Sequence, residues 1–291
     1  MRLATPLFLL LLPACLVAQT PSLGERLKAE RPAIEQLMAQ LDYPEAQKRS
    51  EALLPATTPA FDKKDNNTLI QGCALYLDLA AANRLAAETA DSAGAWEKAL
   101  EYAKAAKALA SESYGNIKEP FAQTITYYIS LGLRAKQVLE ENSDRIKELK
   151  TKPTALDPGE RQELDLALGV EKEVVDSAKW VKFFQTYIDV AKRESEAYNP
   201  LIKIMEDKLK GEADQVADYK AGKGEVHKWV DAVISTPAYL EAQGDKAGRA
   251  RWLHRLAKLD PDSRKVQHQL DVLNGKAAPT PAKPAKKGKK T

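Results

Sequence analysis

Apolar residues recur every three to four positions along most of this chain, which is the spacing that places them on one face of an α-helix. Alternation with a period of two, which would indicate β-strands, is nearly absent. The pattern therefore predicts an all-α protein whose helices pack through apolar stripes. The expected helices cover residues 22–41, 44–54, 68–90, 96–111, 119–150, 158–198, 200–222, 225–243, 246–259 and 261–273.

Several helix ends carry recognisable signals. Ser22 followed by Glu25 is a capping-box pattern, and Pro158 directly after Asp157 suits the first position of a helix. Pro32 leaves open whether the first helix is divided in two, whereas Pro237 is expected to interrupt the segment 225–243.

An aromatic stripe lies in the segment 158–198. Its members are Trp180, Phe183, Phe184 and Tyr187, which are spaced three, four and seven residues apart and so share one helical face. A ligand groove could use such a stripe to stack a sugar or a peptide side chain. A packed helix interface would have the same pattern, and it is the favoured interpretation because aromatic side chains dominate burial where helices meet.

The N-terminus has the pattern of an export signal. Arg2 precedes an apolar run that ends at Ala18, before the polar residues Gln19 and Thr20. The run is too short to span a bilayer, which requires about 20 apolar residues. Residues 1–18 are therefore predicted to be a signal peptide that sends the protein to a bacterial envelope.

Cys15 raises an alternative for the processing of this signal. The residues Leu12 to Cys15 resemble the bacterial lipobox, in which a cysteine after a small residue becomes the acylated N-terminus of a lipoprotein. A cut after Ala18 would instead release a periplasmic protein beginning at Gln19, and both outcomes remain open. Cys73 is the other cysteine, so the mature chain has no intramolecular disulfide, and Cys73 is expected to be a small buried side chain.

The net charge of +3 hides an uneven distribution. Six lysines lie in the last sixteen residues, and without them and Arg2 the chain has 37 basic and 41 acidic residues. An acidic body does not favour polyanions, so no nucleic-acid partner is expected.

The C-terminal residues 275–291 are rich in Lys, Pro and Ala and contain no large apolar side chain, so they are predicted to be disordered. Flexible lysines could hold the protein to an anionic envelope polymer or lipid, each contributing about 1 kcal/mol near such a surface. These residues are Lys283, Lys286, Lys287, Lys289 and Lys290. A solubilising end without a partner is the alternative.

Sequence signatures of catalysis and of metal or cofactor binding are missing. The three histidines, His227, His254 and His268, are not paired at the spacing that places two metal ligands on one helical face. The chain also lacks the zinc-protease, haem-attachment, phosphate-loop and Gly-x-Ser-x-Gly motifs. We therefore expect a non-enzymatic protein without a metal or cofactor.

Three segments, at residues 41–46, 94–100 and 244–261, share a turn followed by a helix. They resemble the turn and second helix of tetratricopeptide repeats, and Ala99 and Ala106 occupy positions where that family has small residues. The resemblance implies an α-solenoid-like array of antiparallel helical hairpins that offers a concave surface to a protein or peptide.

The expected organisation has N-terminal hairpins at 19–115, a region of long helices at 116–224 and a tetratricopeptide-like hairpin with a capping helix at 225–274. The sequence thus favours a protein-interaction scaffold. Ligand binding through the aromatic stripe and tethering through the lysine tail remain as alternatives.

Overall fold

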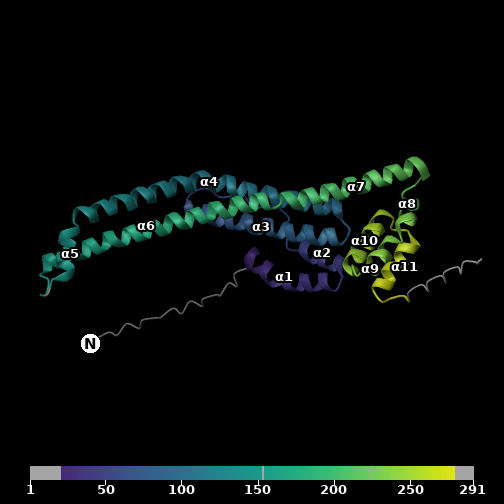
Figure 1. Ribbon diagram of the computed structural model, residues 1–291, viewed down its shortest axis with the longest axis horizontal. Coiled ribbons are helices and arrows are strands. Elements are labelled where there is room, and N and C mark those ends of the chain that lie inside the picture. Colours follow the sequence, from purple (N-terminus) through teal and green to yellow (C-terminus); the bar gives the residue numbers. More distant parts are fainter. Residues whose placement is uncertain (1–20, 153, 224, 279–291) are drawn as a thin grey trace, which may run out of the picture.

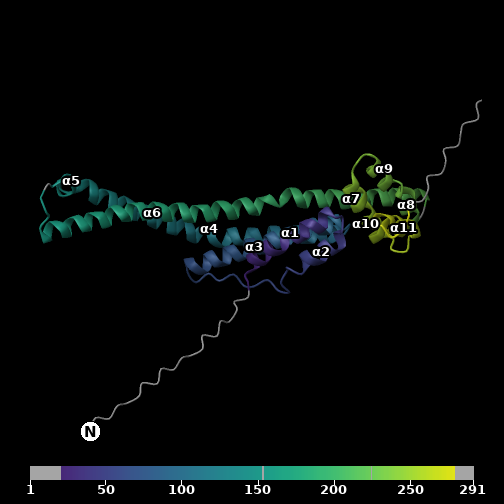
Figure 2. The same cartoon turned by 90° about the horizontal axis from the view of Figure 1, so that it is seen from below.

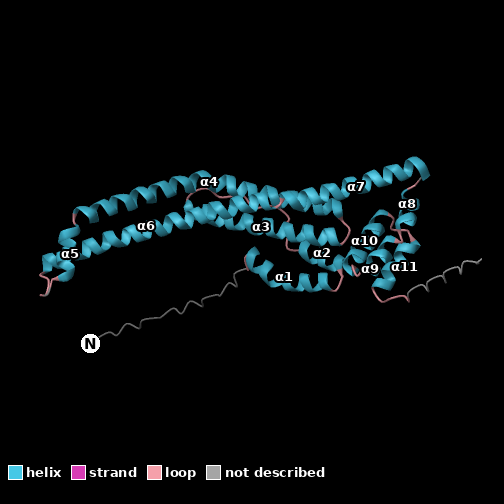
Figure 3. Ribbon diagram, in the orientation of Figure 1, coloured by secondary structure: helices cyan, strands magenta, loops and turns pink. Residues whose placement is uncertain are grey.

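The computed structural model describes residues 21–278 with the exception of residues 153 and 224. Over these residues the regular secondary structure is entirely helical, which confirms the all-α prediction (Figure 3). The helices are α1 (Leu23–Ala39), α2 (Tyr43–Glu51), α3 (Asn66–Ser92), α4 (Trp96–Glu141), α5 (Ser143–Thr151), α6 (Pro158–Ala197), α7 (Asn199–Lys223), α8 (Val226–Val233), α9 (Thr236–Ala242), α10 (Lys246–Leu259) and α11 (Arg264–Leu273).

A long hairpin of α4 and α6 sets the shape of the molecule (Figure 1). The 46 residues of α4 span about 70 Å, and the short helix α5 at the far end leads the chain back into α6. Beyond Tyr198, α7 continues in the direction of α6 and packs along the first part of α4. The hairpin thus forms a rod that extends well past the other helices.

The N-terminal helices cover only one half of this rod. In both views α1, α2 and α3 lie along the half that is distant from α5 (Figures 1 and 2). α3 runs antiparallel to the first part of α4 after a turn at Gly94, which has a φ of 72°. The other half of the rod consists of α4, α5 and α6 alone among the described segments.

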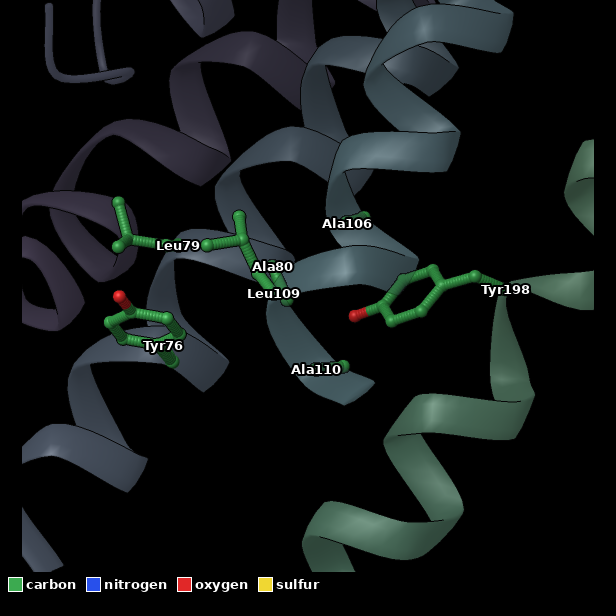
Figure 4. Close-up of a cluster of buried hydrophobic side chains, with 7 residues drawn as sticks. All are labelled: Tyr76, Leu79, Ala80, Ala106, Leu109, Ala110 and Tyr198. Carbon is green, nitrogen blue, oxygen red and sulfur yellow. The ribbon is translucent and has the colours of Figure 1, made fainter. Parts of the chain in front are cut away.

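Small side chains allow close packing in the body. Ala80 on α3 and Ala106 and Ala110 on α4 are fully buried, and the ring of Tyr198 points toward the two α4 alanines (Figure 4). Ala99 is also fully buried, so both alanines that the repeat resemblance singled out lie in the core. A neighbouring cluster joins α3, α4 and α6 through Cys73, Phe121 and Phe184.

The helices α8, α10 and α11 form a separate core around Trp229, Leu253 and Leu256. This C-terminal module packs at the end of the molecule where α4 begins, and α10 also contacts α3. α7 joins the module to the rod.

The expected helices at 96–111 and 119–150 are wrong as separate elements, because α4 is continuous to Glu141. Pro120 lies inside α4, and contacts with α3 and α6 support the helix on both sides of it. Pro32 is likewise accommodated inside α1, whose predicted capping box of Ser22 and Glu25 is confirmed. The expected start of the last helix at residue 261 is wrong because the Ser263 side chain caps α11.

A regular array of antiparallel hairpins is not confirmed. α4 and α6 are far longer than the helices of the C-terminal module, and the expected division between residues 115 and 116 falls inside α4.

Candidate interaction surface

The structure divides the aromatic stripe of α6 between core and surface. Phe184 is 3% exposed and packs against Phe121 with ring centroids 4.9 Å apart. Trp180 and Phe183 are 44% and 37% exposed, while Tyr187 is partly buried. The packed-interface interpretation therefore describes Phe184, whereas Trp180 and Phe183 present ring surface to solvent.

The position of the first residue of α3 explains this exposure. The side-chain amide of Asn66, at the start of α3, donates a hydrogen bond of 3.2 Å to the hydroxyl of Thr124 on α4. Before this point on the rod, α3 covers α4 and α6. Past it, the groove between α4 and α6 continues without a third helix in the described part of the chain.

Apolar side chains nevertheless remain frequent along the uncovered half. Nine large apolar residues that are exposed lie on α4 and α6 in or beside this half. They are Tyr127, Ile129, Leu133, Val138, Leu166, Leu168, Val175, Trp180 and Phe183. Such a concentration on one helical hairpin is unusual for a surface that only contacts water.

Helical spacing places these residues on two opposite sides of the hairpin. Leu131 and Val138 are seven residues apart, as are Gly169 and Asp176 on α6, so each pair shares a side. We call the side that carries Tyr127, Leu131, Val138, Leu166, Gly169 and Trp180 the groove face. The opposite side, which we call the back face, carries Ile129, Leu133, Leu168 and Val175, displaced from the first set by two residues along each helix.

Two hollows mark the groove face. The first measures about 390 Å³ and lies between Leu131 of α4 and Gly169 and Trp180 of α6. The second measures about 410 Å³ and lies nearer the tip, between Val138 and Leu166. Tyr128 lines the first hollow and stacks on Trp180 at 6.0 Å with an interplanar angle of 18°.

Charged residues lie within the groove face as well as at its tip. Lys172, Glu173 and Asp176 line the hollow beside Trp180. At the tip, Arg145 of α5 binds Glu163 of α6 at 3.0 Å. Large apolar and aromatic side chains with a few charged ones among them have the composition of a protein-binding surface.

The buried nucleophile in this region is poorly placed for chemistry. Burial raises the pKa of the Cys73 thiol despite a hydrogen bond of 3.2 Å from the Ser113 hydroxyl. Burial also raises the pKa of the nearby Tyr187 phenol. A protonated thiol without access to solvent neither attacks a substrate nor binds a metal.

A second buried polar site holds the C-terminal module in place. Arg255 of α10 is 2% exposed and binds Glu212 of α7, with one N–H to carboxylate distance of 2.7 Å. It also binds Glu97 of α4 and donates to the carbonyl oxygen of Gly94 at 3.1 Å. Burial alone would lower the pKa of Arg255, but hydrogen bonds and charge from the two glutamates outweigh it and raise that pKa.

His254 adjoins Arg255 and packs against α2. Its ring centroid lies 5.9 Å from that of Tyr43, and burial lowers its pKa to about 4, assisted by the charge of Lys258. Within the described residues its Nε2 atom has no hydrogen-bond partner. The arrangement is that of a neutral histidine packed between helices.

Metal-binding clusters and membrane-spanning helices are absent from the described residues. No group of three or more His, Cys, Asp or Glu side chains there could hold a metal ion. In that same part of the chain, no helix is long and apolar enough to cross a membrane.

Cys15 and the tail residues Lys283, Lys286, Lys287, Lys289 and Lys290 lie outside the described residues. The proposals of lipidation and of contact with an anionic surface therefore remain predictions.

The sequence contains signals for the exposed apolar faces of the hairpin and for the buried Arg255 cluster, and neither was predicted from it. Ile129, Leu131 and Leu133 alternate along α4, so apolar residues reach two sides of one helix, which a helix with a single core face does not require. Arg255 stands between Leu253 and Leu256 within the apolar stripe of α10. A charge at such a position indicates a buried ion pair.

Comparisons with known proteins give no relative. No family model matches the chain, and no curated protein or solved structure matches it either.

Proposed function

We propose that this chain is an exported bacterial envelope protein that acts as a helical scaffold for protein–protein interaction and not as an enzyme. The observation that carries the proposal is the groove face, an apolar strip on a rod that extends beyond the rest of the molecule. Large apolar patches on soluble proteins mark sites of association.

The geometry of the groove favours a helical occupant. α3 already fills the same groove over the first half of the rod, where Cys73 packs with Phe121 and Phe184. The uncovered half continues this packing surface, so an apolar helix face of a protein partner is the ligand that matches it.

Photo-crosslinking in the producing cells tests the scaffold proposal. A photo-reactive amino acid in place of Leu166, on the groove face, should give a discrete protein adduct. The matched control has the same amino acid in place of the exposed Asp207 on α7 and should give none. The proposal is contradicted if neither Leu166 nor Val138 gives an adduct in exported protein.

Two hairpins support a relation to tetratricopeptide-like folds. The elbows at Gly94 and Gly244 both have positive φ angles, of 72° and 86°, and each leads into an amphipathic helix. We propose that the α3–α4 and α9–α10 elbows are tetratricopeptide-like units of an α-solenoid type, joined by a rod that does not repeat.

Carbohydrate binding is a second candidate, and the hollow beside Trp180 favours it. There an exposed indole lies close to the carboxylates of Glu173 and Asp176, a combination that can stack and hydrogen-bond a sugar ring. Calorimetric titration with soluble hexose and N-acetylhexosamine oligosaccharides tests this candidate. Heat of binding that disappears in Trp180→Ala would favour it over the protein scaffold.

Export and anchoring rest on the sequence. We propose residues 1–18 as a signal peptide, with either Gln19 or an acylated Cys15 as the mature N-terminus. The mass of the N-terminal peptide from purified protein distinguishes the two. Deletion of residues 276–291 should reduce binding to an anionic envelope polymer at low salt if the lysine tail is a tether.

A further inference from the structure

We infer that the groove face binds a second copy of this chain, so that two rods form an antiparallel four-helix bundle. The inference rests on the proposed function, because it identifies the protein partner of the same surface. Four observations carry it: the continuity of the groove with the α3 interface, the size of the face, the position of α3 and an open glycine.

The groove between α4 and α6 already holds a helix along part of its length. Over the covered half of the rod, α3 lies in the groove and buries Phe121 and Phe184. Thr124, Tyr127 and Leu131 follow one another at spacings of three and four on α4, so the surface that Asn66 contacts continues directly into the groove face. A further layer of helix in line with α3 would extend the same packing.

The groove face is large enough for a specific interface between two copies. Between Gly159 and Trp180 the α6 helix rises about 30 Å, and two adjacent helices are about 20 Å wide, so the groove face covers roughly 600 Å². Two copies that place these faces together would bury about 1,200 Å² in total, which is at the lower end for specific interfaces. A dimer with a dissociation constant in the micromolar range fits this size.

The third observation fixes the orientation of the two copies. α3 stands on the groove side of the rod and adds a layer about 10 Å thick. If the rods ran in parallel, the two α3 helices would meet and hold the groove faces apart. In the antiparallel arrangement the tip of each rod, near Arg145, points toward the Asn66 end of the other copy's α3. The two groove faces can then come into contact.

The fourth observation is Gly169. It lies inside α6 between the two hollows, and a Cβ atom added there would meet no atom within 4 Å. Glycine in a helix interior is unfavourable by about 1 kcal/mol relative to alanine, and no contact within the described chain requires it. Because the hollows lie on either side of it, Gly169 falls near the two-fold axis of the antiparallel pair, where two α6 helices approach most closely.

Sedimentation of the full chain between about 1 and 200 μM tests the inference. A monomer–dimer equilibrium is expected, and a chain that stays monomeric at 200 μM would overturn the proposal. The double variant Val138→Glu with Leu166→Glu should raise the dimer dissociation constant at least ~100-fold, because it places four charges in the interface.

A matched variant on the back face controls for this effect. Leu133→Glu with Val175→Glu adds the same charges at positions of similar exposure, 62% and 52% against 45% and 66% for Val138 and Leu166. It should change the dissociation constant by less than about threefold. A larger effect from the back-face pair than from the groove-face pair would overturn the assignment of the face.

A single cysteine tests the two-fold axis directly. Gly169→Cys should form a disulfide between copies under mild oxidation, because the two positions meet near the axis. Gly115→Cys is the control, since Gly115 is also a helix-interior glycine with no atom within 4 Å of an added Cβ. Equal crosslinking of the two variants would contradict the axis.

The photo-crosslinking experiment separates the two levels of the proposal. If the chain with the photo-reactive residue at position 166 gives adducts of twice the chain mass, in cells and as pure protein, the result supports both the scaffold proposal and the dimer. An adduct with a different protein, together with a monomeric pure chain, leaves the scaffold standing and overturns the dimer. The absence of any adduct overturns both.

Discussion

The guanidinium group of Arg255 in α10 donates two hydrogen bonds, of 2.9 and 2.8 Å, to the carboxylate of Glu97, which lies 158 positions earlier in the first turn of α4. On its other side the same group binds Glu212 of α7. Three helices that are distant in sequence thus meet at one buried cation. The planar guanidinium binds each of the two carboxylates through two N–H groups, for which an ammonium group has too few donors.

Removal of this cation should strongly destabilise the protein. Arg255→Ala leaves Glu212 buried without a counter-charge, and we expect a loss of about 3–5 kcal/mol in the free energy of unfolding. Urea denaturation followed by circular dichroism measures it. Arg251→Ala on the exposed side of α10 is the control and should change stability by less than about 0.5 kcal/mol. A loss below about 1 kcal/mol in Arg255→Ala would show that the cluster does not hold the module.

Gly94 provides a second test of the same junction. Its φ of 72° disfavours other residues, and a Cβ atom there would lie 2.3 Å from the backbone nitrogen of Arg255. Gly94→Ala should therefore reduce the free energy of unfolding by at least ~2 kcal/mol. Gly115→Ala, which meets no atom, should instead stabilise α4 by up to about 1 kcal/mol. Equal effects of the two substitutions on the thermal midpoint would contradict this account.

The stability of the protein should fall in mild acid because of His254. Its folded-state pKa of about 4 lies below the ordinary value of 6.5, so the unfolded chain binds a proton first as the pH falls. The stabilising contribution is complete above pH 6.5 and is lost progressively toward pH 4, amounting to about 3 kcal/mol. Tyr43 of α2, Asp42 directly before that helix and Lys258 of α10 are the ionisable groups that face this ring.

The variant His254→Leu isolates this contribution. Between pH 6.5 and 4 its free energy of unfolding should decline less than that of the unmodified chain, because the carboxylates still titrate but the imidazole does not. His227→Gln, at an exposed position of α8, is the control and should retain the full decline. Parallel pH profiles of His254→Leu and the unmodified chain would contradict the prediction.

Local signals in the sequence predicted most of the helices. Caps such as Ser22 with Glu25, and the elbow at Gly94, depend on residues a few positions apart, so their geometry is present in a short segment. The predicted helix boundary inside α4 was wrong. A proline at position 120 usually ends a helix, but here contacts with two neighbouring helices keep α4 continuous.

The partial exposure of the aromatic stripe could not be predicted in the same way. Whether Trp180 and Phe184 are covered depends on where α3 begins, more than 110 residues earlier in the chain. Periodicity gives the face on which a residue lies but not what covers that face. The Arg255 cluster depends likewise on contacts across 43 and 158 positions.

Phe184, the buried member of the aromatic stripe, and Trp180, an exposed member, should respond differently to truncation. Phe184→Ala removes a ring that is 3% exposed and packs on Phe121, and we expect a loss of about 3–5 kcal/mol in the free energy of unfolding. Trp180→Ala removes a ring that is 44% exposed, so the loss should be about 1 kcal/mol, close to the value of its stacking on Tyr128.

Concentration separates the structural role of Trp180 from its role in association. The stability difference between Trp180→Ala and the unmodified chain should be small at about 1 μM and should grow at about 100 μM, because the dimer adds binding free energy only to the chain with an intact groove face. For Phe184→Ala the difference should be large at both concentrations. A Trp180→Ala effect that equals that of Phe184→Ala at low concentration would show that Trp180 belongs to the core and not to a binding surface.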